Sequence, residues 1–322
     1  MRREIITWSV ALAVIIGGFA GTVAILNSSL YSAAGFVRSY LDALARHDAD
    51  GARELAEWQL VSGDASEELL VPEAMGELSD IQLVSDQAGA DGVHHVVYSY
   101  TADGVEGTSA FDVRATGTVL GLFTSWQFAT NPYGVVQLTV AHGDEFSIGG
   151  MDLVTPEPDV ASPYIVFTPG TYEMSHESTF LHGEAIAVTS TQPGGVVDAQ
   201  LDIEPTQAMI DEVQAQVGAH LTDDCATQVV LLPTGCPFGH PVSNRVDSTP
   251  QWSMVEFPPV TLEPGTEPET WRMPPTRGTA HLLVDVKSLF DGSVTTFDED
   301  VEFSASYLVT FLPGDKLLVT AQ

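Results

Sequence analysis

The sequence predicts an α+β protein that begins with a transmembrane helix and continues in three exported folding units. The residues from Ile5 to Leu26 carry no charge. After them, helical periodicity gives way to strand-like alternation, and the same order recurs after residue 200. We therefore expect a cytoplasmic tail at 1–4, a membrane helix at 5–26, an α+β domain at 29–130, a small all-β domain at 131–200, and a second helix-plus-antiparallel-sheet domain at 201–322.

The apolar run is long enough to cross a bilayer. At about 1.5 Å per residue, its 22 residues span about 33 Å, against a hydrocarbon core of roughly 30 Å. A cleaved signal peptide with a site at Ser32-Ala33-Ala34 is the alternative. However, the apolar part of such a signal is usually only about 7–15 residues long, and this site falls inside the first helix expected of the folded part. The sequence therefore favours an uncleaved, single-pass anchor. Arg2-Arg3 also hints at a twin-arginine signal, but the residues that follow fit that pattern poorly.

Charge sets the expected orientation and limits the partners. Arg2 and Arg3 precede the span, so the positive-inside rule places the N-terminus in the cytoplasm and the domains outside. Removing Arg2, Arg3 and Glu4 from totals of 11 Lys+Arg and 44 Asp+Glu leaves 9 and 43, a net charge of −34. Such a surface repels nucleic acid and would attract a cationic ligand or a basic protein partner. Acidity as an adaptation to a salty habitat is the open alternative.

Two glycines in the predicted membrane helix have the spacing of a helix-packing motif. Gly17 and Gly21 are four residues apart, and Ala13 and Ala24 extend the row of small residues. Small residues at this spacing let two membrane helices approach closely. The sequence therefore permits a homo-oligomer through this helix, but small residues are common in membrane helices without such a role, and that interpretation is the favoured one.

Residues 30–60 predict two helical pieces separated by a short turn. The apolar residues of the first piece recur at three- and four-residue steps, which is typical of one buried stripe: Phe36, Val37, Tyr40, Leu41 and Leu44. The turn runs from His47 to Gly51, with Asp48 or Asp50 placed to cap a second piece over Ala52–Trp58. A calcium loop is disfavoured because Ala52 stands where a third oxygen ligand is needed.

A change to period two after this point predicts an antiparallel sheet. Residues 93–101 read as a strand, and apolar residues alternate with polar ones over 111–116. Residues 118–129 (TVLGLFTSWQFA) predict one fully covered strand. A helix of this length followed by antiparallel strands predicts a curved sheet wrapped on the helix.

The amino-acid sequence of this region resembles that of a known superfamily. The segment FVRSYLDALARHDADGARELA, followed by strands, is similar to the opening of NTF2-like (cystatin-like) cone-shaped domains in envelope proteins of actinobacteria and their relatives. The likeness covers residues 29–130 and includes no catalytic residue. It implies a fold rather than an activity, because members range from enzymes to binding modules.

The rest of the chain predicts short strands and one more helix. Strands are expected at 133–140, 163–172 and 184–190, and the block FTPGTYEM resembles small β domains that lie between cone-shaped domains in such proteins. Pro205 begins a predicted helix with Ile210, Val213, Val217 and Leu221 on one face. Strands at 280–287, 301–311 and 316–320 follow, which suggests a second cone-like domain.

Cys225 and Cys236 are the only cysteines of the sequence. In an oxidising compartment an isolated even pair predicts a disulfide. Zinc is the sharper alternative, because His220 and His240 bracket the pair, but structural zinc sites usually contain a closer Cys pair. Free thiols remain a third possibility. The stretch CATQVVLLPTGCPFG also resembles a segment of C-terminal domains in actinobacterial membrane proteins of unknown activity, which implies a structural role.

Motifs for catalysis are incomplete in this sequence. Neither lysine lies in a Walker A or Ser-x-x-Lys motif, and there is no Gly-x-Ser-x-Gly elbow. His176-Glu177 begins a HExxH pattern that fails at Phe180. His94 and His95 are adjacent on a strand, so they point to opposite faces. Asp298-Glu299-Asp300 predicts a solvated turn before a strand, with calcium as the alternative.

We therefore expect a membrane-anchored extracytoplasmic binding or structural protein of the cell envelope, without catalytic activity, cofactor or metal. Two alternatives stay open. One is an exported hydrolase or isomerase that uses an NTF2-like cavity, which a deep pocket containing His94, His95 or a carboxylate would favour. The other is an accessory subunit of a transport or wall-assembly complex, joined through Gly17 and Gly21.

Overall fold

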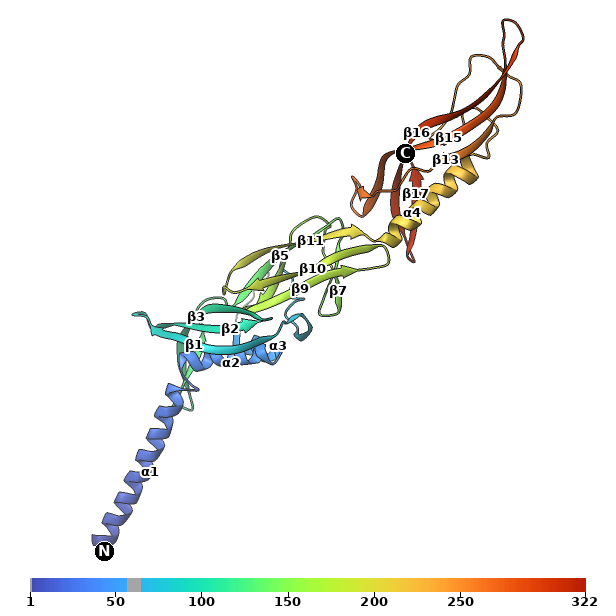
Figure 1. The fold of residues 1–322 in the computed structure, drawn as a ribbon. Coiled ribbons are helices and arrows are strands. Elements are labelled where there is room, and N and C mark those ends of the chain that lie inside the picture. Colours follow the sequence, from blue (N-terminus) through green and yellow to red (C-terminus); the bar gives the residue numbers. More distant parts are fainter. Residues whose placement is uncertain (1, 57–64) are drawn as a thin grey trace.

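The computed structural model describes residues 2–56 and 65–322, and they form a mixed α+β protein. The chain is elongated, with helix α1 (Arg2–Ser28) at one end and three β-sheets following one another away from it (Figure 1). Three clusters of buried side chains follow the three sheets, and the first cluster also contains Tyr133, Ile165 and Phe167 of the middle sheet. The C-terminal sheet therefore lies at the end of the molecule farthest from α1.

Two helices cover the first sheet. Helix α2 (Ala33–Ala45) is capped by Ser32, whose side chain accepts a hydrogen bond from the Gly35 N–H. Helix α3 (Ala49–Ala56) is preceded by Asp48, whose carboxylate accepts from the Gly51 N–H at 3.0 Å. Asp48 is therefore the cap, and α3 begins three residues earlier than the sequence predicted. Trp58, the predicted end of this helix, lies outside the described residues.

The first sheet is antiparallel, with its strands in chain order: β1 (Leu78–Ala88), β2 (Val93–Ala102), β3 (Val105–Val119) and β4 (Phe123–Phe128). Aromatic rings fill the space between α2 and this sheet. The Tyr40 ring centroid lies 6.0 Å from that of Phe111 and 5.2 Å from that of Phe128, and all three side chains are buried. The interior of this unit is thus a packed core.

The prediction of a single covered strand over 118–129 is wrong. A turn divides this segment into the end of β3 and all of β4, and most of β4 is only half-buried. Leu120 and Gly121 both have left-handed backbone angles, with φ of 54° and 70°. Two consecutive residues with positive φ make the tight turn that matches the twist of a hairpin. The apolar character of Leu120 hid this turn from the sequence analysis.

The middle sheet has seven strands in the order β7-β6-β9-β10-β11-β5-β8. All neighbours are antiparallel except β11 and β5, which pair in parallel. The predicted strand at 163–172 is in fact two, separated by a turn at Thr168-Pro169. The bounds are β5 (Tyr133–Ala141), β6 (Glu145–Ile148), β7 (Met151–Val154), β8 (Ser162–Phe167), β9 (Gly170–Glu177), β10 (Leu181–Ser190) and β11 (Val196–Pro205). A short 3-10 helix, η1 (Pro72–Ala74), precedes β1.

Helix α4 (Gln207–Ala219) follows β11 almost directly, so the middle and C-terminal sheets are joined by a short connection. Pro205 ends β11 rather than starting the helix, and Thr206 is the cap, its hydroxyl accepting from the Met209 N–H. Val213, Val217 and Leu221 are buried as the predicted face, while Met209 rather than Ile210 completes it. One π-helical turn, η2 (His220–Cys225), continues α4.

A long two-stranded ribbon dominates the C-terminal sheet. Strands β15 (Thr270–Lys287) and β16 (Val294–Leu312) pair over most of their length, and β17 (Lys316–Ala321) pairs with β16. The predicted strands at 280–287, 301–311 and 316–320 lie within these three. The remaining strands of this sheet are short and pair with β15: β12 (Arg245–Val246), β13 (Gln251–Glu256) and β14 (Glu263–Pro264).

The acidic run 298–300 is not a turn before a strand, as predicted, but lies within β16. Asp300 and Asp298 contact the two ring nitrogens of His281 on β15 at 2.8 Å and 3.0 Å. The hydrogen bond to Asp300 is the main cause of a raised pKa of His281. The run is therefore explained by cross-strand pairing.

Candidate functional site

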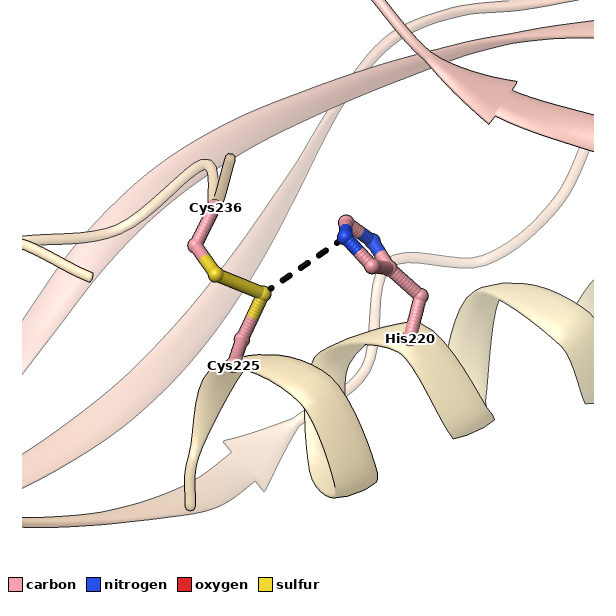
Figure 2. Close-up of side chains that lie close together, drawn as sticks. All are labelled: His220, Cys225 and Cys236. Carbon is pink, nitrogen blue, oxygen red and sulfur yellow. Dashed lines mark hydrogen bonds between the residues drawn. A yellow bond between two sulfur atoms is a disulfide. The ribbon is translucent and has the colours of Figure 1, made fainter. Parts of the chain in front are cut away.

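Three features of the molecule bear on function: the cross-linked cysteines, a cleft between the second and third sheets, and the surface of α1. The cysteines form a disulfide, with their sulfur atoms 2.09 Å apart and their Cα atoms 5.7 Å apart (Figure 2). Cys225 ends η2 and is fully buried, whereas Cys236 lies in the following loop and is partly exposed. The bond therefore fastens the end of the helix to the loop that leads back to the sheet.

His220 lies beside this disulfide (Figure 2). Its Nε2 is 3.7 Å from the Cys225 sulfur, and its Nδ1 is 2.9 Å from the Tyr307 hydroxyl. His240 does not join the group, because its ring stacks on Phe297 at 4.4 Å between centroids. The two sulfurs bond to each other, and a metal would need them as thiolates. The predicted alternative, a set of two histidines and two cysteines, is therefore not assembled.

A cleft of about 330 Å³ lies between the middle and C-terminal sheets. Its volume is at the lower end of the range for small-molecule sites. The middle sheet contributes His142, Asp144 and His176, and the C-terminal part contributes Glu269 and Asp315. The side chains of Phe180 and Phe311 add apolar wall. Charged and aromatic groups from both units therefore meet in one cleft.

The electrostatics of this cleft favour a positive charge. The pKa of Glu269 is raised, first by its partial removal from water and then by the neighbouring carboxylates of Asp144 and Glu145. His176 lines the cleft, is 7 % exposed, and receives no hydrogen bond to its ring from the residues that the structure describes. A cation or a donor N–H entering the cleft would relieve the carboxylate repulsion and could pair with this imidazole.

The two histidines proposed as signs of an enzyme do not line this cleft. His94 bonds Asp86 at 2.6 Å, and its ring lies 4.8 Å from that of Trp126. His95 bonds Asp112 at 2.8 Å. Both are thus paired with carboxylates of neighbouring strands. His94 lies on the face of β2 that packs on the aromatic core, whereas His95 lies on the opposite, exposed face.

Gly17 and Gly21 lie on an uncovered part of α1. An added Cβ at either position would meet no atom within 4 Å in this chain. The described residues from Leu12 to Thr22 are all exposed. The structure brings no other predicted site residue near this pair, so packing through Gly17 and Gly21 stays a prediction.

A search of the described residues for membrane-spanning helices finds no single helix that is long and apolar enough, and one bent pair, Leu12–Ser28 with Ala33–Ala45 at 59°, that qualifies by length and composition.

Comparison with family models, curated proteins and solved structures finds no match to this chain. The cleft residues were missed by the sequence analysis because they come from segments more than a hundred residues apart, such as Asp144 and Glu269. In the sequence, His176 attracts notice only as the start of an incomplete HExxH motif. Local sequence patterns do not indicate that residues this far apart line one cleft.

Proposed function

We propose that this chain is a membrane-anchored extracytoplasmic binding or structural protein of the cell envelope. The observation that carries the proposal is helix α1, which extends over 27 residues away from the sheets (Figure 1). Most of its described large apolar side chains are uncovered; Trp8, Leu12 and Ile15 are 78 %, 58 % and 67 % exposed. Apolar area costs about 25 cal/mol per Å² in water, so a bilayer is the medium that stabilises such a helix.

Length, charge and sequence resemblance support the same proposal. The uncharged run Ile5–Leu26 lies wholly within α1. Arg2 and Arg3 favour a cytoplasmic N-terminus, and the acidic remainder is then outside. We further propose that α2, α3 and the first sheet form an NTF2-like domain of the kind found in actinobacterial envelope proteins. The order of two helices followed by an antiparallel sheet supports this assignment.

Alkaline extraction of membranes tests the anchor. The full chain is expected to stay in the membrane pellet after carbonate washing, because removing α1 from the bilayer would expose its apolar surface. A matched chain that lacks residues 2–26 is expected in the supernatant. Release of the full chain by carbonate would contradict the proposal.

The binding part of the proposal concerns the cleft between the second and third sheets. We propose that it takes a cationic group, such as an organic ammonium ion or the guanidinium of a basic protein. The carboxylates of Asp144 and Glu269 supply negative charge, and Phe180 and Phe311 supply walls on which a flat cation can lie. Buried His176, unpaired among the described residues, supplies an acceptor.

Binding of a hexa-arginine peptide, measured by calorimetry at low salt, tests this part. Asp144→Asn with Glu269→Gln is expected to weaken binding by about a hundredfold or more, since hydrogen bonds to charged groups contribute roughly 1.5–3 kcal/mol each and every 1.4 kcal/mol or so is a factor of ten. The matched control is Asp80→Asn with Glu106→Gln, which removes the same charge from an open depression on the first sheet. Equal losses in both variants would mean unspecific attraction to an acidic surface and would contradict a cleft site.

A further inference from the structure

We propose that the tip of the β3–β4 hairpin, residues 119–122, inserts into the bilayer surface beside α1 and fixes the angle at which the folded part leaves the membrane. This inference rests on the proposed membrane anchor and adds a second contact with lipid. The tip exposes three large apolar side chains: Val119 is 49 %, Leu120 85 % and Leu122 40 % exposed.

The residue at the first central position of this turn, Leu120, is unusual for its backbone conformation. Leu120 has a φ of 54°, a region where a residue with a side chain costs about 1–2 kcal/mol. Asn, Asp or Gly are the usual residues at such a position. The turn itself is regular, with the Leu122 N–H donating to the Val119 carbonyl at 3.1 Å. An exposed leucine here is unfavourable for the backbone and also in water. Burial of its side chain in lipid would remove the second of these two costs.

Two hydrogen bonds join the hairpin to Asn27, at the C-terminal end of the proposed membrane-spanning segment. Asn27 directly follows the apolar run, and its side chain bonds the hairpin twice. Its Nδ2 donates to the Leu122 carbonyl at 2.8 Å, and its Oδ1 accepts from the Thr124 N–H at 3.1 Å. Along α1, Val23 and Leu26 are partly buried, in contrast to the exposed residues from Leu12 to Thr22. The hairpin therefore lies beside the last turn of the helix.

Aromatic side chains strengthen this junction. Tyr31 stacks on Phe123 with centroids 4.4 Å apart, and the Trp126 indole N–H donates to the Tyr31 carbonyl at 2.8 Å. Tyr and Trp are enriched at the membrane–water interface, where an apolar ring and a polar group are both satisfied. The junction thus has the composition of an interfacial belt.

Charge around the hairpin is also suited to lipid. No Asp, Glu, Lys or Arg occurs between Arg114 and Asp144, although the chain after the span contains 43 acidic residues. An uncharged tip avoids both the cost of placing a charge among acyl chains and repulsion from anionic headgroups.

The opposite end of the molecule offers a matched control. The tip of the β15–β16 ribbon exposes Leu289 by 74 % and Phe290 by 99 %. This ribbon lies in the sheet farthest from α1 (Figure 1). Both hairpin tips therefore expose apolar side chains, and of these two only the β3–β4 tip lies next to the proposed span.

The test uses single-cysteine variants of the full chain in vesicles of phosphatidylcholine and phosphatidylglycerol. Leu120→Cys, Phe290→Cys and Phe19→Cys are each labelled with the polarity-sensitive dye NBD without reductant, since both native cysteines are in the disulfide. We expect blue-shifted emission that spin-labelled lipid quenches several-fold at 19 and at 120, and neither effect at 290. Leu120 and Phe290 are exposed, so these changes leave the packing intact.

The three labels separate two kinds of failure. Quenching at 19 with none at 120 would overturn the hairpin inference and leave the anchor in place. No quenching at 19 would contradict the anchor itself, and the inference with it. Equal quenching at 120 and 290 would overturn the inference as well, because it would indicate general adsorption to the vesicle.

Discussion

Replacing Cys225 and Cys236 together by alanine is expected to destabilise the C-terminal sheet by about 3 kcal/mol. The disulfide joins residues 11 apart in sequence. Without it the unfolded chain gains conformational entropy, and for a loop of this length that gain lowers the free energy of unfolding by about 3 kcal/mol. Cys225 is fully buried and belongs to the core of the C-terminal sheet, so its loss also removes packing. Urea unfolding followed by tryptophan fluorescence measures the effect.

Trp252 is one of five tryptophans in the sequence, and it lies next to the cross-linked loop. Its indole N–H donates to the carbonyl of Val230, inside the loop that the disulfide closes, at 2.8 Å. Reduction of the unmodified chain is a control that breaks only this bond, because the two cysteines are the only ones in the sequence. It is expected to lower the urea midpoint of the fluorescence transition as the double variant does. Unchanged midpoints in both experiments would refute a stabilising role for the cross-link.

Gly149→Ala is expected to cost about 2–5 kcal/mol in the middle sheet. Gly149 has a φ of +56°, and a Cβ there would lie 1.7 Å from the carbonyl oxygen of Glu73. The left-handed conformation contributes about 1–2 kcal/mol, and displacing the backbone of η1 contributes about 1–3 kcal/mol more. Because η1 ends in buried Ala74, its displacement would disturb the core of this sheet.

The adjacent Gly150 provides the control for this prediction. Its φ is +82°, but a Cβ there would meet nothing within 4 Å. Gly150→Ala should therefore cost only the conformational part, about 1–2 kcal/mol. Thermal unfolding of both variants measures the difference. Equal losses of stability in the two variants would mean that the backbone of Glu73 does not restrict a side chain at residue 149.

Elements with a strong local pattern could be predicted from the sequence. The apolar stripe of α2, the alternation in β2 and the apolar face of α4 each depend on residues close together in the chain. The cysteine pair was predictable because the sequence contains only two cysteines, so each has one possible partner within the chain.

Features that depend on distant segments could not be predicted. Strand β11 pairs in parallel with β5 about sixty residues earlier, and no local signal specifies that neighbour. Leu120 concealed a turn because its side chain is apolar and only Gly121 signals a break. The cleft required Asp144 and Glu269 to meet across two sheets. In each case tertiary packing, rather than propensity, decides the outcome.

Labelling by a membrane-impermeant maleimide tests the central claim, that α1 crosses the bilayer and the acidic part faces outward. Right-side-out vesicles from expressing cells would carry either Phe290→Cys, at the distal tip, or Glu4→Cys, before the span. We expect residue 290 to be labelled in sealed vesicles and residue 4 only after detergent is added. Labelling of residue 4 alone in sealed vesicles, or of residue 290 only after detergent, would contradict the claim.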